Sequence, residues 1–371
     1  MAYDLDSNVA RYLPGGQTSK RLVSSYVLDW VTIVFVAAVG GVLYKITGYK
    51  HAFSINDPAI SYPLVTDTVS ITIVGIVAFV IPAVVIFVLT LLIPSSSIEA
   101  SGNRDSTGTW NRRLWEWHAG WLGLGLSLAG AFFVTSGLKD VVGKPRPDLL
   151  ARCDPDLSNL AAHLVGGLGL NERSAPILVD TSICRNPDSS VVKNGFAAFP
   201  SGHSSFCWAG LLYLSLWLSV KFAITFPAPL RMPTYQAQGS TRVDFVPDAR
   251  VGGSFRSSAA APPLYLLLLV MSPVGAALYI CATRYADYMH AGWDILGGSL
   301  IGIAFAYLGF RWYHIPFGDG GWAWGPRSTH EAFGVPFGTS NFARNRWIPG
   351  DSRRNANGYE DLELGPVARG V

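Results

Sequence analysis

Long apolar stretches separated by short polar segments dominate the pattern of this chain. A helix needs about 20 mostly apolar residues to cross the hydrocarbon core of a bilayer. Six stretches reach this length, and the sequence predicts transmembrane helices near residues 26–46, 69–93, 118–138, 202–224, 264–283 and 295–313. The second stretch carries neither the polar stripe of a soluble amphipathic helix nor the alternation of a barrel strand, so we expect helical spans.

The composition also favours a membrane protein. Charged residues make up 14% of the chain, against about 25% in an average soluble protein, which leaves too little polar surface for a soluble enzyme. The hydrophobic fraction of 50% excludes a disordered chain. A net charge of +3 is too small to indicate nucleic acid as a main partner. The sequence therefore predicts an all-α, polytopic integral membrane protein with six transmembrane helices.

The distribution of basic residues predicts the orientation of these spans. Six spans place both termini on one side, and that side carries the majority of the 28 Lys and Arg residues, which is typical of the cytoplasm. We expect residues 1–25 to be a cytoplasmic segment without the apolar run of a cleavable signal. Residues 26–315 are expected to form the transmembrane domain, and residues 316–371 a disordered cytoplasmic tail.

Three clusters of charged and polar residues lie at span ends on the predicted non-cytoplasmic side. The first, KDVVGKPRP, follows the third span and places Lys139 and Arg146 seven residues apart, with Pro145 and Pro147 ending the helix. The planar fork of an arginine and the point charge of a lysine together suit an anion. The alternative is the ordinary positive flank of a membrane span.

The second cluster, FPSGHSS, opens the fourth span. Ser201 has the character of an N-cap, and the amides that follow it form an anion site with the helix dipole. Gly202 lets the backbone approach a ligand closely, and His203 in the first turn is suited to pass a proton to a leaving oxygen. The alternative is a simple cap with an interfacial histidine.

The third cluster, TRYADYMHAGWD, connects the fifth and sixth spans. His290 and Asp294 are four residues apart, so on a helix they share a face, and the carboxylate would orient the imidazole. Arg284 adds a further cation at the end of the fifth span. A His–Asp pair on its own is more often a structural hydrogen bond, but the three clusters on one side of a membrane together indicate a chemical site.

The combined pattern resembles the signature of the type 2 phosphatidic acid phosphatase (PAP2) superfamily. That signature reads Lys, six residues, Arg-Pro; then Pro-Ser-Gly-His; then Arg, five residues, His, three residues, Asp. The six spans are similar to the lipid phosphate phosphatase branch, and RPDLLARCDPDL resembles fungal diacylglycerol pyrophosphate phosphatases. Two departures, Thr283 for the usual Ser and Ala291 for a frequent second His, remove no catalytic group.

The resemblance implies a haloperoxidase-like helical core over about residues 25–315, with active-site loops at 139–203 and 284–294. It implies that His290, oriented by Asp294, attacks phosphorus, while His203 protonates the leaving oxygen and then activates water. Five residues are expected to bind the phosphate oxygens: Lys139, Arg146, Ser201, Gly202 and Arg284. Neither a metal nor another cofactor is implied, because these groups supply the positive charge.

The implied function is metal-independent hydrolysis of phosphatidate, diacylglycerol pyrophosphate or lysophosphatidate from the bilayer, through a phosphohistidine, in phospholipid metabolism. The expected site faces the lumen of the vacuole, Golgi or endoplasmic reticulum, or the cell exterior. One alternative is an isoprenoid or sphingoid phosphate as substrate. Another is a non-catalytic transporter or scaffold, which the presence of His290 and Asp294 disfavours. The oligomeric state stays open.

Two further features of the loop between the first two clusters stay open at this level. Cys153 and Cys184 both lie in a predicted lumenal or extracellular loop, where a disulfide is permitted. Lys144 lies between the two motif cations and either contacts a second phosphate of a pyrophosphate substrate or is an ordinary surface lysine.

Overall fold

A computed structural model of the chain describes residues 20–93, 106–170, 172, 175–222, 224, 263–314, 323, 327, 332 and 333. The chain divides into two compact units. One comprises residues 1–29, 93–116 and 325–371, and the other comprises residues 30–92 and 117–324. The predicted cytoplasmic segment 1–25 and tail 316–371 lie mostly outside the described residues, so both stay predictions.

Long helices form at each of the predicted spans. They are α2 (Lys20–Lys45), α4 (Ile81–Leu92), α5 (Ser106–Val142), α8 (Gly202–Lys221), α10 (Leu264–Ala286) and α11 (Gly292–Tyr313). The second span is continuous from α3 (Ile71–Gly75) through the π-helical turn η3 (Ile76–Val80) into α4. Ser70 caps this span at its start, where its hydroxyl accepts from the amide of Ile73.

Five helical stretches are long and apolar enough to cross a membrane, judged by length and composition within the described residues: 20–45, 71–92, 113–142, 264–286 and 292–313. They confirm five of the expected spans. The remaining one, α8, is helical as predicted but is not among these apolar stretches. The total of six spans therefore stays a prediction.

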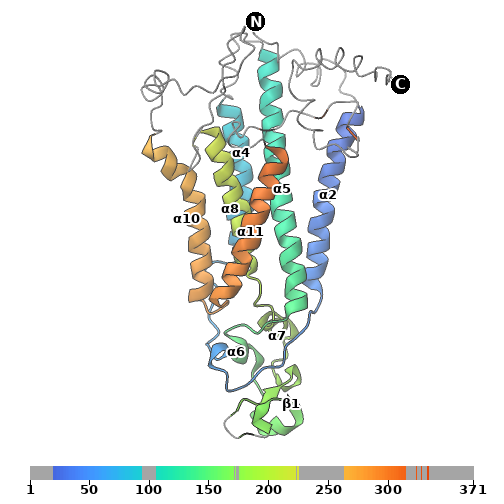
Figure 1. The fold of residues 1–371 in the computed structure, drawn as a ribbon, viewed down its shortest axis with the longest axis vertical. Helices are drawn as coiled ribbons and strands as arrows, with labels where there is room; N and C mark the ends of the chain where they lie inside the picture. Colours follow the sequence, from blue (N-terminus) through green and yellow to red (C-terminus); the bar gives the residue numbers. More distant parts are fainter. Residues whose placement is uncertain are drawn as a thin grey trace, which may run out of the picture. The chain divides into compact units, whose positions relative to one another are not determined.

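Helix α8 is less apolar because it lies among other helices. It packs against α3, α4, α10 and α11, and thirteen of its twenty residues are buried (Figure 1). Its polar groups bond to neighbouring helices: Ser215 donates to the carbonyl of Val270 and Tyr213 to that of Gly120, each at 2.8 Å. A helix surrounded by protein does not need the continuous apolar surface that lipid requires.

Two glycines let α11 approach α8 closely. A side-chain carbon at Gly298 would overlap the carbonyl of Ser201, and one at Gly302 would overlap the carbonyl of Ser205. At the start of the same contact, the amide of Ser201 donates to the carbonyl of Asp294 over 2.9 Å. This close packing fixes the N-terminal ends of α8 and α11 against each other.

The segments outside the long helices form a small folded region. Its elements are η2 (Pro58–Ile60), α6 (Leu149–Cys153), η5 (Leu157–His163), β1 (Leu164–Gly166), η6 (Leu168–Leu170), β2 (Leu178–Val179), η7 (Thr181–Ile183) and α7 (Ser189–Gly195). Strands β1 and β2 pair antiparallel, with Leu164 opposite Val179. A core of buried apolar residues, among them Phe53, Ile183 and Phe196, holds these elements together.

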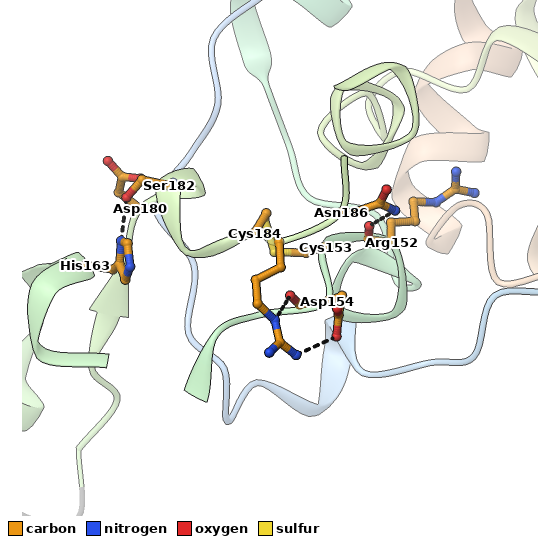
Figure 2. Close-up of a disulfide and its surroundings, with 9 residues drawn as sticks. Arg152, Cys153, Asp154, His163, Asp180, Ser182, Cys184 and Asn186 are labelled. Carbon is orange, nitrogen blue, oxygen red and sulfur yellow. Dashed lines mark hydrogen bonds and ion pairs between the residues drawn. A yellow bond between two sulfur atoms is a disulfide. The ribbon is translucent and has the colours of Figure 1, made fainter. Parts of the chain in front are cut away.

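A disulfide joins Cys153 at the end of α6 to Cys184 after η7 (Figure 2). The pairing that the sequence left open is thus formed in the structure. Beside it, Asn186 donates to the carbonyl of Arg152 at 2.7 Å, and Arg185 pairs with Asp154 at 3.2 Å. The cross-link and these bonds hold α6 against the chain that leads to α7.

In the smaller unit, the charge within the first predicted span has a partner. Nη2 of Arg327 lies 2.7 Å from Oδ2 of Asp29, and the backbone amide of Arg327 donates to the hydroxyl of Tyr26 over 2.9 Å. The one acidic residue of this span is therefore neutralised by a basic residue.

Candidate active site

The three predicted clusters meet at one end of the helices of the larger unit. The C-terminal ends of α5 and α10 and the N-terminal end of α11 lie beside α6 and α7 (Figure 1). The N-terminal end of α8 joins them through the bond from Ser201 to the carbonyl of Asp294. The charges of Arg146 and Lys139 and the ring of His203 all interact with His290. Residues more than 150 positions apart thus share one site.

His290 is a buried, neutral imidazole with a defined tautomer. It lies between α10 and α11, and its Nδ1 is 2.7 Å from the carbonyl oxygen of Ala198. Because a carbonyl only accepts, Nδ1 carries the proton and Nε2 carries the lone pair. Burial, followed by the charges of Arg146 and Lys139, holds the pKa of His290 well below its usual range. A neutral imidazole with an available lone pair is suited to nucleophilic attack.

The structure corrects the expected partner of Asp294. The sequence placed Asp294 and His290 on one helix face, but α11 begins at Gly292, so His290 precedes the helix. Oδ2 of Asp294 accepts from the amide of Ala291 at 2.9 Å, and Oδ1 lies 2.7 Å from Nζ of Lys144. Asp294 therefore holds the backbone next to His290, while Ala198 fixes the imidazole tautomer.

Arg146 is a buried cation with weakly occupied donors. Nη2 donates to Oδ1 of Asn194 at 2.8 Å, whereas the one partner of Nη1 among the described residues is the thioether of Met289 at 3.3 Å, which is a weak acceptor. Its buried Nε has no hydrogen-bond partner within the described part of the chain. Burial lowers the pKa of Arg146 to about 10, so the guanidinium stays charged at neutral pH. Such donors suit a strongly accepting anion.

Lys139 and the start of α8 form the second part of the site. Nζ of Lys139 donates to the carbonyl of Ala197 at 3.2 Å and would lie 3.7 Å from a side-chain carbon placed on Gly202. The predicted N-cap is confirmed, because the hydroxyl of Ser201 accepts from the amide of Ser204. The lysine therefore lies beside a helix N-terminus, where dipole and amides favour negative charge. That Ser201 and Gly202 also contact phosphate stays a prediction.

Arg284 brings a segment into the site that the sequence analysis missed. Its Nη2 pairs with Oδ2 of Asp287 at 2.7 Å, and its Nη1 with Oδ1 of Asp67 at 2.9 Å. The carboxylate of Asp287 also accepts from the amide and the hydroxyl of Thr68. The carbonyl of Val69 lies 3.1 Å from Nε2 of His203. Asp287, three residues after Arg284, could have been suspected from spacing, whereas nothing in the local pattern marks Asp67.

Arg152 is a further buried cation beside these groups. It pairs with Asp148 over 2.6 Å and donates to the thioether of Met289 at 3.2 Å. Within the described ranges, His, Cys, Asp and Glu side chains form no group of three or more that could hold a metal ion. The arrangement of a neutral imidazole, a second histidine and several cations is chemically suited to transfer of a phosphoryl group.

Comparison with known proteins identifies the class. The model of the PAP2 superfamily matches residues 120–316, which is just over half of the chain and includes all three clusters. The chain therefore belongs to the PAP2 superfamily, as the sequence motifs predicted.

Several curated relatives align over most of their length. A PA-phosphatase related-family protein of Dictyostelium discoideum is 28% identical over 293 residues, which cover 79% of this chain and 71% of the relative. Lipid phosphate phosphatase 2 of Arabidopsis thaliana is 27% identical over 79% of each chain. Diacylglycerol pyrophosphate phosphatase 1 of Saccharomyces cerevisiae is 25% identical over 78% of this chain and 80% of its own. No solved structure matches the chain.

Proposed function

We propose that this chain is an integral membrane lipid phosphate phosphatase of phospholipid metabolism. Its substrates are phosphatidate, diacylglycerol pyrophosphate or lysophosphatidate. The observation that carries the proposal is the buried neutral His290, with its proton held on Nδ1 by Ala198 and two motif cations close by. The names of the relatives, lipid phosphate phosphatase and diacylglycerol pyrophosphate phosphatase, support the same class of substrate.

The reaction has two steps at one histidine. Nε2 of His290 attacks phosphorus, a nitrogen–phosphorus bond forms, and the bond from phosphorus to the leaving oxygen breaks. His203 gives its proton to that oxygen. In the second step His203 takes a proton from water and the water oxygen bonds to phosphorus. The nitrogen–phosphorus bond then breaks, which frees Nε2 of His290 and yields inorganic phosphate. Asp294 acts as a positioning residue through the amide of Ala291.

Cationic side chains stabilise the charge that the phosphoryl oxygens carry. Arg146 and Arg284 are buried, and Lys139 lies beside the first turn of α8. In many enzymes, fixed positive groups aimed at developing negative charge make the largest contribution to stabilising the transition state. They take the place that a divalent cation has in other phosphoryl transfers, which supports a metal-independent reaction.

The site belongs on the non-cytoplasmic side of the membrane. The disulfide of Cys153 and Cys184 supports this side, because disulfides persist in oxidising compartments. The proposed organisation is a cytoplasmic segment 1–25, a transmembrane phosphatase domain 26–315 with six spans, and a cytoplasmic tail 316–371. The membrane is the plasma membrane or that of the vacuole, Golgi or endoplasmic reticulum.

The proposal is tested by phosphate release from phosphatidate and diacylglycerol pyrophosphate in detergent micelles containing EDTA. We expect release by the wild type and loss in His290→Ala. His163→Ala is the matched control, because His163 is a partly exposed histidine whose Nδ1 bonds the hydroxyl of Ser182 in the loop region. Release from an isoprenoid or sphingoid phosphate alone would contradict the substrate class, and release abolished by EDTA would contradict metal independence.

A further inference from the structure

Arg284 is a fully buried cation whose guanidinium is shared by two carboxylates. Its side chain is 1% exposed, and Asp67 and Asp287 each bind one of its terminal nitrogens. Nε and Nη2 also reach the hydroxyl of Thr283 at 3.4 Å, and within the described residues Asp67 is the one partner of Nη1. A phosphate oxygen that approaches Nη1 therefore meets the carboxylate of Asp67 on the same nitrogen.

The two carboxylates are held very differently. Asp287 lies on α10's C-terminal flank, its side chain is 8% exposed, and it also accepts two bonds from Thr68. The side chain of Asp67 is 41% exposed, and Arg284 is its one hydrogen-bond partner within the described part of the chain. Asp67 is the partner that is easier to displace, because less structure depends on its contact.

Asp67 also lies where the other cations of the site would attract a phosphate group. Its charge interacts with Arg146 as well as with Arg284, and with the ring of His203. A carboxylate among these groups occupies a position suited to an anionic ligand and repels a second anion brought next to it.

We infer that the Asp67 carboxylate competes with the phosphate group of the substrate for Nη1 of Arg284. This inference rests on the proposed function. During binding the phosphate displaces Asp67, while Asp287 keeps the guanidinium in place. After hydrolysis Asp67 returns to Nη1 of Arg284, so that this nitrogen regains its acceptor and inorganic phosphate leaves more readily. Asp67 thereby sets how tightly the site holds phosphate.

The test compares the affinity for inorganic phosphate between full-length wild type and Asp67→Asn in detergent micelles. We expect the inhibition constant of inorganic phosphate to fall by about fivefold in the variant, the size expected when one partly exposed charge pair is removed. We also expect a lower KM for phosphatidate in Asp67→Asn. Asp67→Glu keeps the charge and the wild-type inhibition constant.

Asp57→Asn is the matched control. Asp57 lies on the same connection between α2 and α3, and within the described residues its carboxylate accepts from the amide of Ala59 alone. This variant removes one negative charge from the segment but none from Arg284, so its inhibition constant stays at the wild-type value. Asp67→Ser provides a second neutral variant if the asparagine variant folds poorly.

Two results would overturn the inference. An unchanged inhibition constant in both neutral variants would mean that Asp67 does not compete. A raised constant together with a lower kcat, restored in Asp67→Glu, would mean that Asp67 positions Arg284 instead. Direct titration of inorganic phosphate by calorimetry needs no turnover. It therefore separates a failure of this inference from a failure of the proposed lipid phosphatase activity.

Discussion

Two residues hold His290 in place, whereas the sequence predicted that Asp294 alone would orient its imidazole. Ala198 fixes the tautomer of His290 through its carbonyl, and Asp294 fixes the backbone beside it. Lys144 completes this arrangement, because its amine lies 2.7 Å from the otherwise buried carboxylate of Asp294. A lysine that appeared either as a second phosphate ligand or as a surface residue thus gains a positioning role.

This role predicts the effect of replacing Lys144. Lys144→Met leaves the Asp294 carboxylate without its counter-charge and disturbs the turn that carries His290. We expect kcat to fall about tenfold, equally on phosphatidate and diacylglycerol pyrophosphate, and stability to fall by about 1 kcal/mol because the lysine is partly exposed. Lys144→Arg restores kcat. A loss confined to the pyrophosphate lipid would instead assign Lys144 to the second phosphate.

The depressed pKa of His290 predicts the pH dependence of the first step. Below its pKa the imidazole gains a proton on Nε2 and loses its lone pair, so activity falls on the acid side. Since burial and the neighbouring cations lower this pKa well below 6.5, protonation of His290 does not reduce kcat/KM between pH 7.5 and pH 6.5. A pH–rate profile in micelles checks this. An acid limb centred above pH 6.5 that moves to still higher pH when Arg146 is neutralised would contradict it, because that shift would assign the limb to His290.

Part of the site could be predicted from the sequence, and part could not. Lys139, Arg146, His203, Arg284 and His290 could be chosen because clustered charges at span ends need a reason. Asp67 could not, because its partner is 217 positions away and only the fold brings them together. The expected contact of His290 with Asp294 was wrong, because it required both residues to lie on one helix. Helix α11 begins at Gly292, two residues after His290.

At the scale of elements, the contact of α8 with α11 sets the site. Both helices begin at site residues, and the close approach at Gly298 and Gly302 keeps these beginnings together. The apolar pattern was sufficient to predict where the long helices lie. It could not show that α8 is surrounded by protein, because a central helix loses the apolar excess that marks a lipid-facing span.

Gly302→Ala tests this packing. The added methyl group meets the backbone of Ser205, and overpacking of this kind costs about 1–3 kcal/mol. We expect a lower Tm in detergent and reduced activity. Gly275→Ala in α10 is the control, because nothing lies within 4 Å of a side-chain carbon at that position. A Tm equally unchanged in both variants would contradict the close contact of α8 with α11.

In the whole molecule, the proposed topology has the disulfide-linked loop region and the site on the same, non-cytoplasmic side of the membrane. The basic residues predict the orientation, and the bond between Cys153 and Cys184 is consistent with it. The remaining cysteines, Cys207 and Cys281, are buried among the helices. The disulfide-bonded pair is therefore the part of the cysteine set that can report on the side of the loop region.

Labelling with a membrane-impermeant maleimide tests this orientation. With the reagent on the non-cytoplasmic face of sealed native membranes, we expect labelling of the partly exposed Cys184, and only after reduction, because the Cys153 thiol is buried. With the reagent on the cytoplasmic face, we expect no labelling of this pair. Cys153→Ser with Cys184→Ser abolishes the signal. Labelling from the cytoplasmic face would reverse the topology, and labelling without reduction would contradict the disulfide.

The central claim is that His290 carries the phosphoryl group during turnover. The most direct measurement is acid-sensitive, base-stable labelling of the full-length protein with lipid radiolabelled in its terminal phosphate, quenched within one turnover and mapped by mass spectrometry. We expect phosphate on His290, absent in His290→Ala and retained in the control His163→Ala. Turnover without a phosphorylated protein, or phosphate on another residue, would contradict it.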